Sequence, residues 1–175
     1  MKISLLSLLL VLLSFAPARA CSCIGERISE QVKINQAYQR DSLILVGKVV
    51  SVETIVLSLD TLHMPSWQSG ADTVYTSRRE GFRYTFAVTR VLKGAATGST
   101  IYVTTANQSS ACGVSLKVGA DYLLHAYKVD QHQTPRGEIK RIAPYFATSI
   151  CHRTRELKYV PRTELRQLAR LARKA

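Results

Sequence analysis

The sequence has few acidic residues, glycines, prolines and aromatic side chains. Its 175 residues include 12 Asp and Glu against 24 Lys and Arg, with 9 Gly, 5 Pro and 7% aromatic residues. The low Gly and Pro content excludes a collagen-like or linker-like chain, and a hydrophobic content of 46% excludes a disordered one. The length fits one domain. The formal net charge of +12 is compatible with a polyanionic partner, with a basic surface patch, or with solubility alone.

The sequence also lacks the motifs of common catalytic sites. It contains no His-Glu-x-x-His, no Gly-x-Ser-x-Gly and no glycine-rich phosphate loop. His125 falls inside an expected strand, which favours a packed or surface residue over a catalytic base. The acidic residues are few and form no close pair suited to acid–base catalysis. We therefore expect a protein that is not an enzyme, requires no cofactor and does not bind nucleic acid.

The first twenty residues have the layout of a secretory signal peptide. A charged start at Lys2 precedes an apolar run over 3–15, and residues 18–20 give a small-x-small ending. The run is shorter than the roughly 18–20 residues that span a bilayer, so no transmembrane segment is expected after signal removal. The sequence thus predicts a signal peptide over 1–20 and one domain over 21–175, secreted to an extracellular or periplasmic space. A lipoprotein signal that would acylate Cys21 is the alternative, although Ala18 and Arg19 do not fit its pattern.

The four cysteines are expected to form disulfides. An even number of cysteines in an exported protein favours disulfides over free thiols. A bridge between Cys21 and Cys23 would close a very small, strained ring, so two connectivities remain open. Each of them ties these two cysteines to Cys112 and Cys151. A structural zinc site is disfavoured, because one residue separates the first pair where two to four are usual.

Hydrophobic patterning predicts a mainly β chain with a helix near each end. The helices are expected over 28–39 and 161–175, where Pro161 in the first turn or Thr163 as the cap would begin the second helix. Strands are expected over 42–55, 82–92, 100–105 and 122–129, with at least one more within 139–150. Residues 57–81 indicate a long excursion, for which a hairpin is one form, and 131–137 indicate a turn. Five or so strands fit a small closed barrel or a sandwich, and a Greek-key barrel of the OB type matches this count.

Basic residues gather beyond Cys151. From His152 onward eight Lys or Arg oppose two Glu, which gives this segment a net charge of +6. Five of these basic residues lie on the expected terminal helix: Arg162, Arg166, Arg170, Arg173 and Lys174. The simpler interpretation is a solvated helix face. The functional interpretation is a face that binds polyanions.

Two cysteine motifs and one isolated cysteine have a familiar arrangement. Cys21-Ser22-Cys23 opens the expected mature chain, Ser109-Ser110-Ala111-Cys112-Gly113-Val114-Ser115-Leu116 lies mid-sequence, and Cys151 precedes the terminal helix. With segments 82–94 and 122–126, they resemble the inhibitory domain of the tissue inhibitors of metalloproteinases. The resemblance implies a netrin-like module, an OB-like closed barrel of five to six strands, and the bridges Cys21–Cys112 and Cys23–Cys151. A third family bridge is missing, since Gln39 stands about where its first cysteine would be.

The resemblance implies a secreted inhibitor of zinc metalloendopeptidases. In that family the α-amine and carbonyl of the first cysteine, here Cys21, ligate the zinc of the target protease in trans. Ser22 would enter the S1′ pocket, and Ile24 and the loop 109–114 would flank it. We call these ten residues the inhibitory wedge: Cys21, Ser22, Cys23, Ile24, Ser109, Ser110, Ala111, Cys112, Gly113 and Val114. The alternative is a netrin-like module that binds matrix or envelope polyanions through the basic helix and inhibits no protease.

Overall fold

The computed structural model describes residues 23, 27–65, 72–96, 98–107, 112–134 and 137–174; of 58–65 and 72–77 it describes the backbone only. The expected signal peptide over 1–20 lies outside the described residues. So do six wedge residues: Cys21, Ser22, Ile24, Ser109, Ser110 and Ala111.

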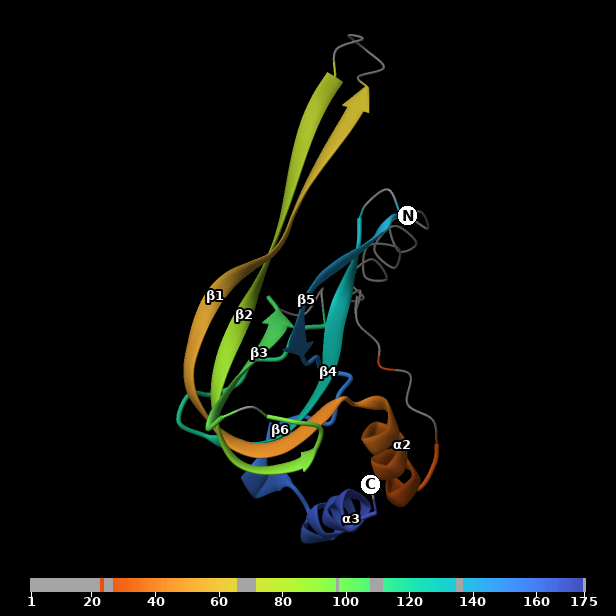
Figure 1. Cartoon of the computed structure of the whole chain (residues 1–175), viewed down its shortest axis with the longest axis vertical. Coiled ribbons are helices and arrows are strands. Elements are labelled where there is room, and N and C mark those ends of the chain that lie inside the picture. Colours follow the sequence, from red (N-terminus) through yellow and green to blue (C-terminus); the bar gives the residue numbers. More distant parts are fainter. Residues whose placement is uncertain are drawn as a thin grey trace, which may run out of the picture.

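Six strands form one sheet whose pairings run in a ring through five of them (Figure 1). The strands are β1 (Leu43–Pro65), β2 (Asp72–Lys93), β3 (Thr100–Ala106), β4 (Asp121–Gln133), β5 (Ile139–Ala147) and β6 (Arg155–Glu156). Their order is β1-β2-β3-β5-β4-β6, and β1 also pairs with β4. The β3–β5 pairing is parallel and short, whereas the others are antiparallel. The expectation of a mainly β chain with a helix near each end is confirmed.

The excursion expected over 57–81 is a continuation of the β1–β2 hairpin. The antiparallel register runs from Ile44 opposite Lys93 out to Pro65 opposite Asp72, and the hairpin projects from the rest of the molecule (Figure 1). The turn expected over 131–137 begins later than predicted. Strand β4 continues to Gln133, because residues 131–133 pair with residues 139–141 of β5.

Two apolar cores explain why β1 begins with a run of hydrophobic residues. Alternate side chains of a strand point to opposite faces. Leu43 and Leu45 therefore join one core with Phe86, Val103 and Leu124, among others. Ile44 points the other way, into a second core that includes Ile34, Leu123, Val160 and Leu168. The second core attaches both helices to the outside of the sheet.

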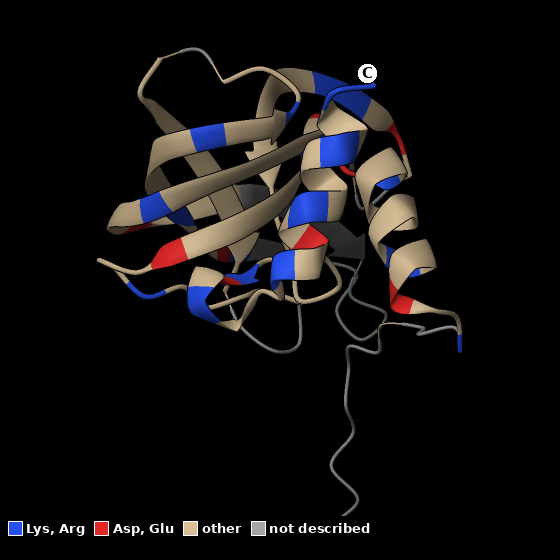
Figure 2. Ribbon diagram, turned by 90° about the horizontal axis from the view of Figure 1, so that it is seen from below, with Lys and Arg blue, Asp and Glu red and all other residues tan. Residues whose placement is uncertain are grey.

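The two described α-helices lie side by side against the sheet (Figure 2). α2 (Glu30–Arg40) begins at its N-cap Ser29, whose hydroxyl accepts from Val32 N at 3.4 Å. α3 (Arg162–Ala172) follows a short 3-10 helix, η2 (Leu157–Tyr159). Pro161 is the N-cap of α3, so the helix begins after Pro161 and Thr163 is not its cap. No helix in the described ranges is long and apolar enough to cross a membrane.

Candidate functional site

A disulfide attaches Cys23 to the segment that follows β5. The Cys23–Cys151 bridge has an S–S distance of 2.12 Å and a Cα–Cα distance of 5.3 Å. It is one of the two bridges that the resemblance implies. Cys112 is disulfide-bonded as well. Its predicted partner Cys21 lies outside the described residues, so that pairing stays a prediction that peptide mapping without reduction can test.

The segment beginning at Cys112 lies against the segment that carries Cys151. The carbonyl oxygen of Cys112 accepts a hydrogen bond from Ile150 N at 3.0 Å. Cys112 has a φ of 58°, in the left-handed region, and Val114 N donates to Thr105 Oγ1 at 2.9 Å. Cys23 is exposed, whereas Cys112, Gly113 and Val114 are half-buried. Cys23 and Cys112 are therefore both attached at residues 150–151, although they come from two distant parts of the sequence.

A buried polar cluster beside this disulfide was not predicted from the sequence. Asp41 directly follows α2, and its side chain is fully buried. Its carboxylate lies 2.8 Å from His125 Nδ1, 2.9 Å from His152 Nδ1 and 2.8 Å from Arg40 Nε. Since an ionised carboxylate only accepts hydrogen bonds, His125 Nδ1 donates to it. His152 Nδ1 also lies 3.2 Å from Arg40 Nη2, which can only donate. We call these four residues, Arg40, Asp41, His125 and His152, the aspartate cluster.

The charge of Asp41 is stabilised by its neighbours. Burial raises the pKa of Asp41, but the hydrogen bonds from His125, His152 and Arg40 outweigh burial and hold the pKa well below its ordinary value. The carboxylate is therefore ionised at neutral pH. Since His152 directly follows Cys151, the aspartate cluster connects the end of α2 to the disulfide.

The histidines of the cluster are packed into the domain. His125 is fully buried, as expected for a packed residue, and its Nε2 has no hydrogen-bond partner among the described residues. The His152 ring stacks on Tyr127 with a centroid distance of 4.8 Å. Within the described ranges, no group of three or more His, Cys, Asp or Glu side chains is arranged to hold a metal ion. The cluster thus has the features of an anchor for the segment after Cys151.

Polar contacts also connect α2 to the segment after Cys151. Gln167 Nε2 donates to Gln31 O at 2.9 Å and to Asn35 Oδ1 at 2.8 Å. Arg153 contacts both Glu30, at 3.1 Å, and Glu164, at 2.9 Å. Because Glu164 is almost fully buried, its pairing with Arg153 satisfies a charge that would otherwise be costly. Hydrogen bonds and ion pairs therefore hold α2 against α3 and the segment that precedes α3.

The basic residues beyond Cys151 fall into two groups. Arg153 and Arg155 contact Glu164, and Lys158 contacts Glu156 at 2.6 Å. The other five are exposed and form no ion pair within the described part of the chain: Arg162, Arg166, Arg170, Arg173 and Lys174. Figure 2 shows Lys and Arg along the helix that ends near the C label. We call these five residues the basic face.

No protein-family model matches the sequence, and no curated protein is significantly similar to it.

Proposed function

We propose that the chain is a secreted inhibitor of zinc metalloendopeptidases, built on an OB-like barrel of the netrin type. One observation carries the proposal. The Cys23–Cys151 bridge lies next to the hydrogen bond from Ile150 N to Cys112 O. Cys23 and Cys112, which the resemblance assigns to the two parts of the wedge, are therefore attached to neighbouring residues, Cys151 and Ile150.

The proposed mechanism is chelation of the target's zinc by the mature N-terminus at Cys21. A catalytic zinc keeps one coordination position for water or substrate. The amine nitrogen of Cys21 would occupy this position and displace the water that attacks the peptide bond, and the carbonyl oxygen of Cys21 would add a fifth ligand. Ser22 would fill the S1′ pocket, with Ile24 on one side and the loop 109–114 on the other. Because disulfides hold the wedge in its binding shape, little conformational entropy is lost on binding.

Inhibition requires a free, neutral amine on Cys21. A free α-amine has an ordinary pKa of roughly 7.7–8.0, so a proton is lost on binding at neutral pH. Affinity should fall as the pH drops below this range, after correction for the titration of the protease. One Ala added before Cys21 removes the amine ligand, and inhibition should weaken by at least about 2 kcal/mol, the scale of a central contact.

The experiment compares three forms of the secreted protein against a panel of zinc endopeptidases. They are the native form, the form with Ala before Cys21, and a matched control with Ala added after Ala175. N-terminal sequencing and intact mass first establish that Cys21 is the free terminus. We expect the native and control forms to inhibit alike and the N-terminal extension to inhibit poorly. Equal inhibition by all three forms would refute chelation.

The second candidate function is polyanion binding without inhibition. The observation that favours it is the basic face, whose five cations lack carboxylate partners within the described residues. Exposed charges are screened by salt, so retention on a heparin or anionic envelope polymer should fall steeply with ionic strength. If the native form inhibits no protease but is retained on such a polymer, this second candidate is favoured.

A further inference from the structure

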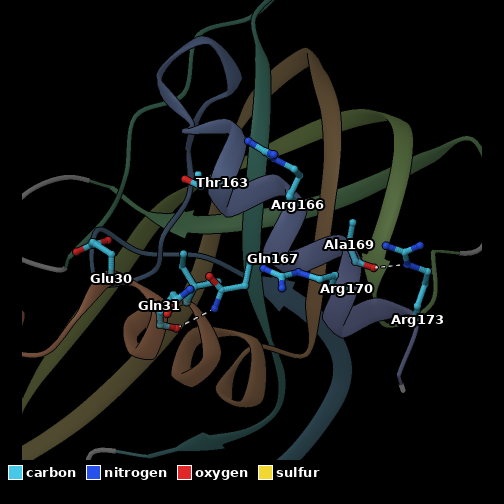
Figure 3. Close-up of a pocket in the computed structure, with 9 residues that line it drawn as sticks. Glu30, Gln31, Thr163, Arg166, Gln167, Ala169, Arg170 and Arg173 are labelled. Carbon is cyan, nitrogen blue, oxygen red and sulfur yellow. Dashed lines mark hydrogen bonds between the residues drawn. The ribbon is translucent and has the colours of Figure 1, made fainter.

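A hollow of about 580 Å³ lies between α2 and α3 (Figure 3). Arg166 and Arg170 line it from α3, Arg173 lines it from the C-cap of that helix, and Gln31 and Ile34 line it from α2. Its size falls in the range of small-molecule sites, roughly 300–1,000 Å³. The two remaining residues of the basic face, Arg162 and Lys174, do not line the hollow.

The three arginines form one row along α3 and its C-cap, Arg173, whose backbone is still in the right-handed helical region. They are spaced four and three residues apart, which places them on the same side of the helix, about 6 Å and 4.5 Å apart along its axis. Arg166 Nε and Arg173 Nε each contact a carbonyl of their own helix at 3.4 Å, from Arg162 and Ala169 respectively. These contacts use one donor of each guanidinium. The row therefore keeps donors available at separate points along the hollow.

Among the described residues that line the hollow, one is a carboxylate, and its charge is already compensated. Glu30 accepts hydrogen bonds from Lys33 Nζ at 2.9 Å and from Arg153 Nη2 at 3.1 Å. These hydrogen bonds lower the pKa of Glu30, so it is ionised and paired at neutral pH. The three arginines thus leave the hollow with an excess of positive charge.

The other lining residues suit a sugar. Gln31 and Thr163 are exposed and polar, whereas Ile34 is apolar. Guanidinium groups bind phosphate and sulfate oxygens in a forked geometry, more specifically than lysines do. We propose that the hollow binds a small saccharide with several sulfate or phosphate ester groups. The inference rests on the polyanion-binding candidate and narrows it to one site. None of the four described wedge residues lines the hollow, so the inference does not depend on protease inhibition.

Isothermal titration calorimetry on the secreted protein tests the site with two probes, sucrose octasulfate and inositol hexakisphosphate, which distinguish sulfate from phosphate esters. Sucrose and inorganic sulfate at matched ionic strength are the controls. Two double variants remove the same charge: R166Q/R170Q inside the hollow, and R162Q/K174Q outside it. We expect R166Q/R170Q to bind the better probe about tenfold more weakly or worse, because charge-assisted hydrogen bonds are lost. R162Q/K174Q should stay within about twofold of the native protein.

The outcomes separate the site from general electrostatic attraction. An equal loss in both variants would overturn the hollow as the site and leave diffuse polyanion binding. If the native protein binds neither probe but is still retained on heparin, the hollow is also overturned as the binding site. All four substituted side chains are exposed, so the variants should fold; an unchanged urea midpoint for both establishes this.

Discussion

Replacement of Asp41 by Asn should be among the most destabilising polar substitutions in this protein. The carboxylate is fully buried and accepts from His125, His152 and Arg40. An Asn keeps one carbonyl oxygen and turns an NH₂ group toward side chains that also donate. Arg40 is half-exposed, with a relative side-chain exposure of 51%, so solvent screening reduces the contribution of its ion pair to the stability. Loss of the contacts with the two histidines should cost about 3 kcal/mol, at the lower end for a broken buried pair.

The loss of stability caused by D41N should depend on pH, and the lowered pKa of Asp41 fixes the direction of that dependence. Because the pKa of Asp41 is lowered in the folded protein, its stabilisation is present above the unfolded value of about 3.8 and is lost as the pH falls toward the folded value. Asn does not titrate. The difference in unfolding free energy between the native protein and D41N should therefore be largest above pH 5 and shrink between pH 4 and pH 3.

Urea denaturation at several pH values measures this difference. The matched control is D130N, because Asp130 is exposed and lies 3.8 Å from Lys128 in a surface ion pair. D130N should change the unfolding free energy by no more than about 0.5 kcal/mol. If D41N costs no more than D130N, or if its cost does not change between pH 5 and pH 3, the account of the aspartate cluster is wrong.

Two further predictions concern covalent and backbone constraints. Removal of the Cys23–Cys151 bridge by C23S/C151S should lower the unfolding free energy by about 4–5 kcal/mol in the chain-entropy model, because the cysteines are 128 residues apart; a loss below about 1 kcal/mol in urea denaturation would contradict this. G94A should cost about 1–3 kcal/mol, since Gly94 has a φ of 79° and a Cβ there would lie 2.5 Å from Ser42 O. In the control G98A, Gly98 has a φ of 97° but a Cβ there would lie in open space. G98A should therefore lower the unfolding free energy less than G94A does by the same measurement.

The strands and helices were largely predictable, because their signals are local. The alternation of Phe82, Tyr84, Phe86 and Val88 predicts one buried face, and these residues belong to or pack against one core. The extension of β1 to Pro65 was less predictable. Its pairing with β2 continues beyond the core, so hydrophobic patterning does not mark where it ends.

The candidate site was predictable from the sequence only where its residues belong to a recognisable motif. The cysteines were identified from their number and their motifs, whereas the aspartate cluster was not identified at all. Asp41 lies 84 residues from His125 and 111 from His152 in sequence, and no short pattern links residues that far apart. A single Asp after a helix and two isolated His carry no local signal. Only the pairing of β1 with β4, and the return of the chain after β5, bring them together.

The Cys23–Cys151 bridge makes a closed covalent ring of most of the domain. The ring contains α2 and strands β1 to β5, including the whole projecting hairpin. A protease that cuts one peptide bond between β1 and β2 opens the backbone, but the disulfide still joins the two pieces. The product is a two-chain protein that migrates as one species until it is reduced. Cleavage of the hairpin by an attacking endopeptidase therefore does not release the N-terminal piece, and Cys23 stays attached to the rest of the domain.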